Sequence, residues 1–164
     1  MVADTRLPAS AGSLPPRLAM SDAVAAVIRL DDGRFLLQLR DVRPDIWYPA
    51  TWGCFGGAVD EGELPLEALR RELREELEYD VLETSPVSTL EFDLRPVGLG
   101  KYYRAYFLVQ MSEKERARLV LHEGERMEAF TYEELRSGMP VTPYDAFALH
   151  LFYARAAGVL CDQI

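Results

Sequence analysis

The chain has 164 residues and a mass of 18.6 kDa, which matches a single domain of about 100–200 residues. Its 49% hydrophobic and 27% charged residues exclude disordered, collagen-like and disulfide-scaffold classes, and no apolar run approaches the roughly 18–20 residues of a membrane span. The 18 Lys and Arg against 27 Asp and Glu give a formal net charge of −9, which argues against a nucleic acid polymer as partner and suits a protein that collects cations.

The chain opens with small residues and prolines over residues 1–19, which predict a flexible arm without the apolar centre of a secretory signal. A single domain is expected over residues 20–164. Within it, β-branched and apolar residues predict strands at Ala23–Leu30 and Arg34–Arg40. The Asp-Gly signal between the two strands predicts the turn of a hairpin.

A long irregular stretch, Asp41–Gly62, follows the hairpin. Loops longer than about 12–15 residues are uncommon unless they serve a function, so this stretch is the first candidate for a binding site. Pro65 then suits the first turn of a helix that is expected to run to Leu77. The leucines of this helix are spaced for one buried face.

The second half of the chain adds three strands, two helical segments and a polar connection. The strands are expected at Thr89–Leu94, Tyr102–Met111 and Ala129–Tyr132, the polar connection at Ser112–Leu119, and the helices at Glu133–Ser137 and from Thr142 to Ala157. A β-rich core that is interrupted by one long acidic helix and closed by another predicts a mixed α/β domain.

Three carboxylates share one face of the acidic helix. At about 100° per residue, Glu72, Glu75 and Glu76 fall within an arc of about 100°, beside the leucine stripe and therefore at the margin of the core. Like charges at these spacings each destabilise a helix by roughly 0.2–0.5 kcal/mol, so a positive partner is expected. A divalent cation that takes oxygen ligands could be this positive partner. The alternative interpretation is that the three carboxylates form a solvated acidic face without a ligand.

Gly56 and Gly57 lie upstream of this helix. A backbone without side chains can approach closely, so its carbonyls can reach a metal and its amides a phosphate oxygen. The glycines and the acidic helix together therefore predict a cradle for a diphosphate and a metal.

The spacing of these residues resembles the Nudix box, a pattern of Gly-x5-Glu-x7-Arg-Glu-U-x-Glu-Glu-x-Gly-U in which U is bulky and apolar. The matching run starts at Gly57, continues through Glu63 and includes residues 71–76. Glu78 stands where the pattern has its last Gly, and Tyr79 stands where an aliphatic residue is usual. A left-handed residue at Glu78 would cost about 1 kcal/mol or more, so the helix is expected to continue a little further.

The resemblance implies an α/β/α sandwich with a mixed sheet, and a metal-dependent pyrophosphohydrolase that cleaves a nucleoside diphosphate linked to another group, such as a nucleotide sugar or a nucleoside triphosphate. Mg²⁺ or Mn²⁺ is the implied cofactor, and a small nucleotide-like diphosphate is the implied substrate. By carry-over, the metal ligands are the carboxylates of Glu72, Glu75 and Glu76 and the carbonyl of Gly56. Arg71 and Glu63 match positions that tie the loop to the helix and orient these carboxylates.

The resemblance also implies that the catalytic base is one of the helix glutamates or a glutamate from a later loop, where relatives often place one. Here that loop offers Glu123 or Glu125 in the run His-Glu-Gly-Glu. Two solvated loop glutamates are the alternative explanation. His122 is an additional candidate proton carrier, although a single loop histidine is more often ordinary surface.

Substrate contacts are expected around the long loop and the neighbouring strands. Cationic side chains there can meet phosphates, aromatic rings can stack on a base or sugar, and a glycine amide can bind a phosphate oxygen. The candidates are Arg40, Trp52, Gly57 and Arg104, with Lys101, Trp47 and Tyr48 beside them.

Two other functions remain open. A non-catalytic nucleotide sensor could keep the same fold, although three carboxylates crowded on one helical turn argue against it. An isomerase of isoprenoid diphosphates uses the same fold, and Cys54 beside the glycines is the residue that would suggest it.

The two cysteines, Cys54 and Cys161, predict a reducing, cytoplasmic setting. Relatives are frequently dimers, so the resemblance also leaves a homodimer open.

Overall fold

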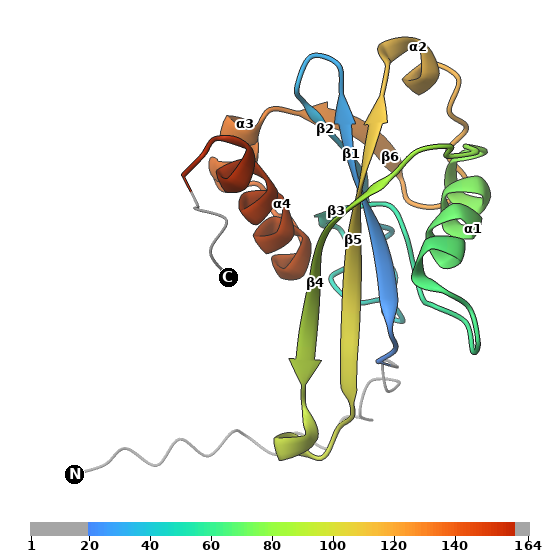
Figure 1. The fold of residues 1–164 in the computed structure, drawn as a ribbon, viewed down its shortest axis with the longest axis vertical. Helices are drawn as coiled ribbons and strands as arrows, with labels where there is room; N and C mark the ends of the chain where they lie inside the picture. The colour runs from blue at the N-terminus through green and yellow to red at the C-terminus, as the bar shows by residue number, and fades with distance from the viewer. Residues whose placement is uncertain (1–19, 160–164) are drawn as a thin grey trace.

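The computed structural model describes residues 20–159, in which a mixed six-stranded sheet forms the centre (Figure 1). The strand order is β3-β2-β1-β5-β4, and β6 also pairs with β2. β1 and β5 run parallel, whereas the other pairs are antiparallel. The strands are β1 Ala23–Leu30, β2 Phe35–Leu39, β3 Trp52–Gly53, β4 Ser85–Asp93, β5 Lys101–Met111 and β6 Arg126–Phe130. The expected arm, residues 1–19, lies outside the described residues.

Helices cover both faces of the sheet, which confirms the expected α/β/α arrangement. Figure 1 shows α1 on one side of the sheet and α3 and α4 on the other. The helices are α1 Pro65–Leu77, α2 Glu113–Arg116, α3 Tyr132–Arg136 and α4 Pro143–Ala156, with a 3-10 turn at Arg95–Val97. None of the described helices is long and apolar enough to cross a membrane.

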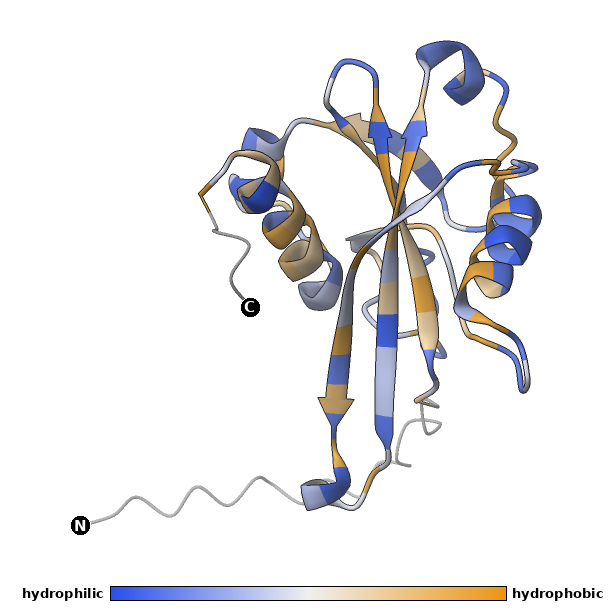
Figure 2. Cartoon of the chain, in the orientation of Figure 1, coloured by the Kyte–Doolittle hydropathy of each residue, from blue (hydrophilic) through white to orange (hydrophobic). Residues whose placement is uncertain are grey.

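The alternation of side chains along β1 divides the core into two layers. Val24 and Ile28 pack with the leucines of α1, whereas Ala25 and Val27 pack with α4 and with Tyr132 of α3. Successive residues of a strand point to opposite faces, so a strand between two helical layers must be apolar throughout. Figure 2 shows that α1 carries many hydrophilic residues, whereas α4 is more hydrophobic.

Two of the predicted strands differ from the sequence-based boundaries by more than one residue. β4 begins at Ser85, four residues before the expected Thr89, because its polar first half pairs with β5 around an irregularity between Pro86 and Ser88. β6 ends at Phe130 because the Thr131 side chain accepts a hydrogen bond from the amide of Glu134 and starts α3 there. The start of β4 depends on long-range pairing with β5, whereas the end of β6 follows from a local capping box between Thr131 and Glu134.

The end of α1 corrects the expectation for Glu78. The helix stops at Leu77, and Glu78 adopts a left-handed conformation with φ 53° and ψ 34°. Its amide donates to the carbonyls of Leu73 and Arg74, and its carboxylate contacts the His122 ring nitrogen at 2.7 Å. The missing glycine therefore leaves the turn intact, and a non-glycine residue takes the strained position.

Replacing Glu78 by glycine is expected to raise the Tm by about 2–4 °C. Relief of a left-handed strain of about 1–2 kcal/mol outweighs the extra backbone entropy of glycine, roughly 0.5–1 kcal/mol. Thermal unfolding in the absence of added metal measures the difference. Glu78→Ala is the control, because it removes the carboxylate and keeps the strain. A Glu78→Gly protein that is no more stable than Glu78→Ala would contradict the explanation.

Candidate active site

Glu76 lies at the inner margin of α1, where the buried leucines of this helix hold it against the glycine loop. The side chain is buried, and its Oε2 accepts a hydrogen bond from the Gly56 amide at 3.0 Å. Burial raises the pKa of Glu76 to about 8, and the negative charges of Glu123 and Glu72 act in the same direction. The expected acidic face therefore reaches into the protein at this point.

The raised pKa of Glu76 predicts that the metal-free protein loses stability as the pH rises. The folded state holds this proton more tightly than the unfolded state, whose carboxyl has the ordinary pKa of 4.5. The contribution of Glu76 to the free energy of unfolding is fully present below pH 4.5. It is lost as the pH rises through about 8, and the loss is on the order of a few kcal/mol. Urea unfolding between pH 4.5 and 8.5 in EDTA measures this slope, which should flatten in Glu76→Gln. An equal slope in both proteins would contradict the prediction.

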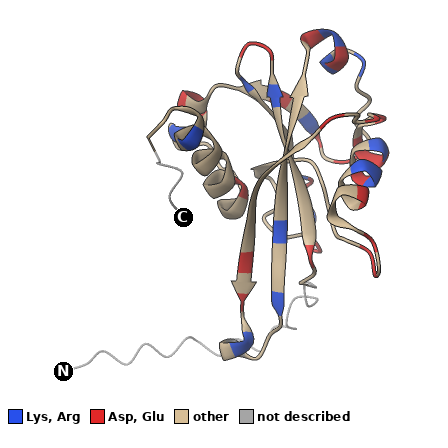
Figure 3. Ribbon diagram, in the orientation of Figure 1, with Lys and Arg blue, Asp and Glu red and all other residues tan. Residues whose placement is uncertain are grey.

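Arg71 joins the loop to the helix through five acceptor contacts. Its guanidinium forms two hydrogen bonds with Glu63, both at 3.0 Å, and one with the Ala58 carbonyl at 2.9 Å. It also donates to Glu72 at 2.8 Å and to Glu75 at 3.3 Å. Burial raises the pKa of Glu72, and Arg71 opposes this shift. Arg71 thus fixes Glu72 relative to the loop and holds the exposed Glu75 only through its longest contact. Figure 3 shows acidic and basic residues gathered along α1.

Gly56 and Gly57 bring the loop into contact with both β1 and α1. The loop pairs with β1, since the Val24 amide donates to the Gly57 carbonyl at 2.9 Å. A Cβ on Gly56 would lie 2.5 Å from the Val24 carbonyl oxygen, and φ at Gly56 is +126°. A Cβ on Gly57 would lie 2.6 Å from the carboxyl atoms of Glu72. Only glycine therefore allows the backbone to lie this close to the acidic side chains.

The loop before β6 brings Glu123 to the same site. Glu123 lines the cavity beside the glycine loop, and its charge raises the pKa of both Glu72 and Glu76. Glu125, in contrast, is outside the cavity lining, and its amide donates to the Leu39 carbonyl where β6 begins. The His122 ring contacts Glu78. Of the three loop candidates, only Glu123 lines the cavity.

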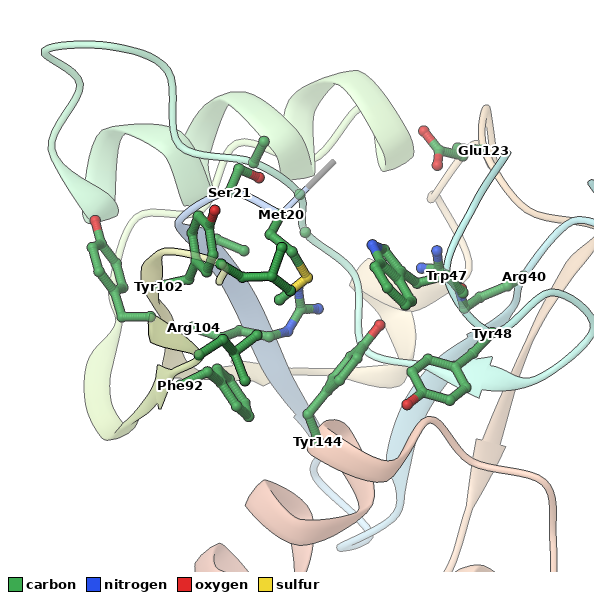
Figure 4. Close-up of a pocket in the computed structure, with 17 residues that line it drawn as sticks. Met20, Ser21, Arg40, Trp47, Tyr48, Phe92, Tyr102, Arg104, Glu123 and Tyr144 are labelled. Atoms are coloured by element: carbon green, nitrogen blue, oxygen red, sulfur yellow. The ribbon is translucent and has the colours of Figure 1, made fainter. Parts of the chain in front are cut away.

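A cavity of about 480 Å³ opens beside the glycine loop (Figure 4). This volume is in the range of small-molecule sites, about 300–1,000 Å³. The aromatic side chains of its wall come from the long loop, from β4 and β5, and from the start of α4. They are Trp47, Tyr48, Phe92, Tyr102, Tyr103 and Tyr144.

Four predicted substrate or catalytic residues line this cavity, namely Arg40, Gly57, Arg104 and Glu123. Trp52 does not, and its predicted substrate contact is corrected by the structure. Its indole is buried in the core, packs edge-on against Phe130 with ring centroids 4.7 Å apart, and lies under the guanidinium of Arg126. The alternatives Trp47 and Tyr48 line the cavity. Lys101 is outside the lining and pairs with Glu91 at 2.9 Å.

Sequence reasoning missed Phe92, Tyr144 and Gln38. The first two belong to β4 and α4 and meet the site only through the fold. Gln38 is a buried polar residue on β2 whose hydrogen bond with Glu76 favours the charged carboxylate. A polar residue in the apolar strand β2 is the one local signal that could have indicated Gln38.

The Cys54 thiol has no place in this site. The side chain is fully buried in the layer below α4, outside the cavity lining, and burial raises the pKa of its thiol well above the ordinary value. Thiol chemistry needs an accessible thiolate. The isomerase alternative therefore loses the residue that suggested it.

The donor set fits a divalent cation that takes oxygen ligands. In the described part of the chain, no three Asp, Glu, His or Cys side chains already form a group that could hold a metal ion. Yet Glu76 is buried there without a basic partner, and Glu72 and Glu123 add negative charge beside it. A bound cation would offset this charge, and the carboxylates would have to converge on it.

Comparison with solved structures finds the same fold in other proteins. A MutT protein from Methanosarcina mazei Go1 has 21% sequence identity and a TM-score of 0.69, with 83% of this chain and 94% of that chain covered. The E. coli ORF135 protein has 28% identity and a TM-score of 0.66, with coverage of 86% and 94%. The E. coli dihydroneopterin triphosphate pyrophosphohydrolase has 23% identity and a TM-score of 0.63, with coverage of 81% and 94%. No curated protein matches the sequence.

The sequence model of the NUDIX domain matches residues 20–151, which include the glycine loop, the acidic helix and the loop that carries Glu123. This match spans most of the chain and agrees with the structural likeness to MutT and Nudix hydrolases. The chain therefore belongs to the Nudix family of hydrolases, which act on phosphoric anhydride bonds.

Proposed function

We propose that the protein is a metal-dependent pyrophosphohydrolase that cleaves the diphosphate of a small nucleotide-like molecule. One observation carries the proposal: a single cavity has aromatic walls and also borders the glycine loop and Glu123, next to the buried carboxyl group of Glu76 on α1. An aromatic pocket suits a base, with stacking worth about 1–3 kcal/mol. The glycine loop and the carboxylates suit a metal-bound diphosphate.

Glu72, Glu75 and Glu76, with the Gly56 carbonyl, would hold Mg²⁺ or Mn²⁺. A cation bound there supplies charge neutralisation for the diphosphate and lowers the pKa of a coordinated water. Glu75 is the most exposed of the three, with a side chain 60% exposed, so it can turn toward the cavity at little cost. Nudix hydrolases generally need divalent metal ions, and this donor set is consistent with that requirement.

The remaining residues orient the substrate and accept a proton. Arg71 orients the Glu72 carboxylate relative to the loop, because it contacts both Glu72 and Glu63. Amides of the loop lie next to the cavity and can donate to phosphate oxygens. Glu123 faces the same region and is the candidate base that takes the proton of the attacking water.

The test is a panel of nucleoside triphosphates, nucleotide sugars and dinucleoside polyphosphates, assayed for phosphate or pyrophosphate release with Mg²⁺, with Mn²⁺ and with EDTA. Metal-dependent turnover of at least one compound supports the proposal. One of the similar structures is a pyrophosphohydrolase of dihydroneopterin triphosphate, so that compound belongs in the panel. Thermal stabilisation by a nucleotide without any turnover would overturn the proposal in favour of the sensor.

A further inference from the structure

A buried carboxylate stands behind the aromatic part of the cavity. Asp145, in the first turn of α4, is almost completely buried. Its Oδ2 accepts hydrogen bonds from the Cys54 amide at 2.9 Å and from the Thr142 hydroxyl at 2.7 Å. Its Oδ1 accepts from the Tyr106 hydroxyl at 2.9 Å and from Nε of Arg104 at 3.3 Å. Four donors from four different residues fix this carboxylate in one position.

Asp145 in turn fixes Arg104, which does line the cavity. The guanidinium carbon lies 4.9 Å from the ring centre of Tyr144 and 5.7 Å from that of Tyr106. Only Nε of Arg104 is used by Asp145, and within residues 20–159 neither Nη atom has a hydrogen-bond partner. The side chain is 12% exposed, and Figure 4 shows it extending toward Tyr144. Arg104 therefore presents two fixed Nη groups with unused N–H donors at the cavity.

The charge balance favours a neutral ligand group at Arg104. Burial lowers the pKa of Arg104, but the charge of Asp145 together with Tyr106 and Tyr144 outweighs this effect and raises the pKa, so the guanidinium stays protonated. Its positive charge is already offset by Asp145 at 3.3 Å, so no negative ligand group is required. The site proposed for the diphosphate lies elsewhere, and Figure 4 places Glu123 and Arg104 on opposite sides of the cavity.

We propose that Arg104 reads the edge of a nucleobase that presents two adjacent hydrogen-bond acceptors, and that Asp145 is its positioning residue. The O6 and N7 atoms of guanine form such an edge, and so do the O2 and N3 atoms of cytosine. Adenine and uracil place a donor beside each corresponding acceptor, so the arginine fork meets only one acceptor. This inference rests on the proposed function and adds the base preference of the same cavity.

The test compares kcat/KM for GTP, CTP, ATP and UTP in the wild-type protein and in Arg104→Lys, with Mg²⁺. The wild-type protein is expected to prefer GTP or CTP over ATP and UTP by about 10-fold or more, the range of one bidentate contact. Arg104→Lys keeps the charge and loses the fork, so the preference should fall to about threefold or less. Arg136→Lys is the matched control, because Arg136 is on α3 outside this cavity, and it should keep the wild-type preference.

Asp145→Asn tests the positioning role without touching the ligand. It should lower kcat/KM for the preferred nucleotide more than it lowers kcat/KM for ATP. A general loss of stability would instead lower both values by the same factor. Thermal shift with GMP, CMP and AMP in EDTA gives a second readout that does not depend on turnover. If Asp145→Asn does not fold, Arg104→Lys carries the test alone.

The outcomes separate the two proposals. Absence of metal-dependent turnover for every compound of the panel overturns the proposed function. Turnover without a preference for GTP or CTP, or with a preference that survives in Arg104→Lys, overturns only the assignment of Arg104. A preference for one of the two bases that is lost in Arg104→Lys supports the assignment and identifies the base.

Discussion

Replacing Glu76 by glutamine is expected to lower metal-dependent turnover by about 100-fold or more while the protein remains folded. The amide has nearly the same shape, so it can still accept a hydrogen bond from the Gly56 amide, but it carries no charge for a cation. Steady-state kinetics with Mg²⁺ measure the loss, and thermal unfolding in EDTA measures stability. The variant should be at least as stable as the wild-type protein without metal, because it removes the buried carboxyl group whose ionisation becomes costly as the pH rises.

Glu83→Gln is the matched control for this experiment. Glu83 is exposed, lies outside the cavity and makes no hydrogen bond or ion pair within the described residues. The same change of charge at this position should leave turnover within about twofold. Wild-type turnover in Glu76→Gln would remove Glu76 from the proposed metal site.

Replacing Gly56 by alanine is expected to destabilise the protein by about 3 kcal/mol or more, which lowers the Tm by roughly 6–12 °C. The added Cβ would lie 2.5 Å from the Val24 carbonyl oxygen and 2.9 Å from the Ala25 Cα. Both atoms are backbone atoms of the central strand β1, so they cannot move aside cheaply. The φ of +126° adds strain for any residue with a side chain. Thermal and urea unfolding measure the loss.

Two neighbouring glycines separate the causes. Gly62 has a φ of +82° with no atom within 4 Å of an added Cβ, so Gly62→Ala should cost only the strain, about 1 kcal/mol. An added Cβ on Gly57 meets the movable carboxyl group of Glu72, so Gly57→Ala should fold but displace Glu72 and lose turnover. If Gly56→Ala were no less stable than Gly62→Ala, the close approach to β1 would not be a significant constraint.

Local signals were sufficient for the acidic helix. The predicted Pro65–Leu77 coincides with α1, because a proline at the first position and leucines at helical spacing depend only on neighbours in sequence. The same spacing placed Glu76 at the edge of the core, where it is buried. The strands β1 and β5 were also predicted within one residue, since their apolar runs are long.

Long-range contacts limited the prediction of the cavity. Trp52 and Trp47 belong to the same loop and have the same chemistry, yet one is in the core and the other lines the cavity. The difference arises because Trp52 pairs with β2 in the short strand β3. Likewise, Arg104 and Asp145 are 41 residues apart and meet only because α4 packs across the sheet. No spacing rule connects such residues.

The two ends of the cavity are built from different parts of the chain. The glycine loop, Arg71 and the carboxylates lie within one continuous stretch, residues 56–76, which folds back on itself. The aromatic wall is instead assembled from the loop around Trp47, from β4 and β5, and from the start of α4. Mutations in those separate segments can change what the protein recognises without altering the residues that would perform the hydrolysis. Such a division allows ligand preference to change during evolution while residues 56–76 stay the same. The aromatic wall is therefore the part of the site to alter in order to redesign ligand preference.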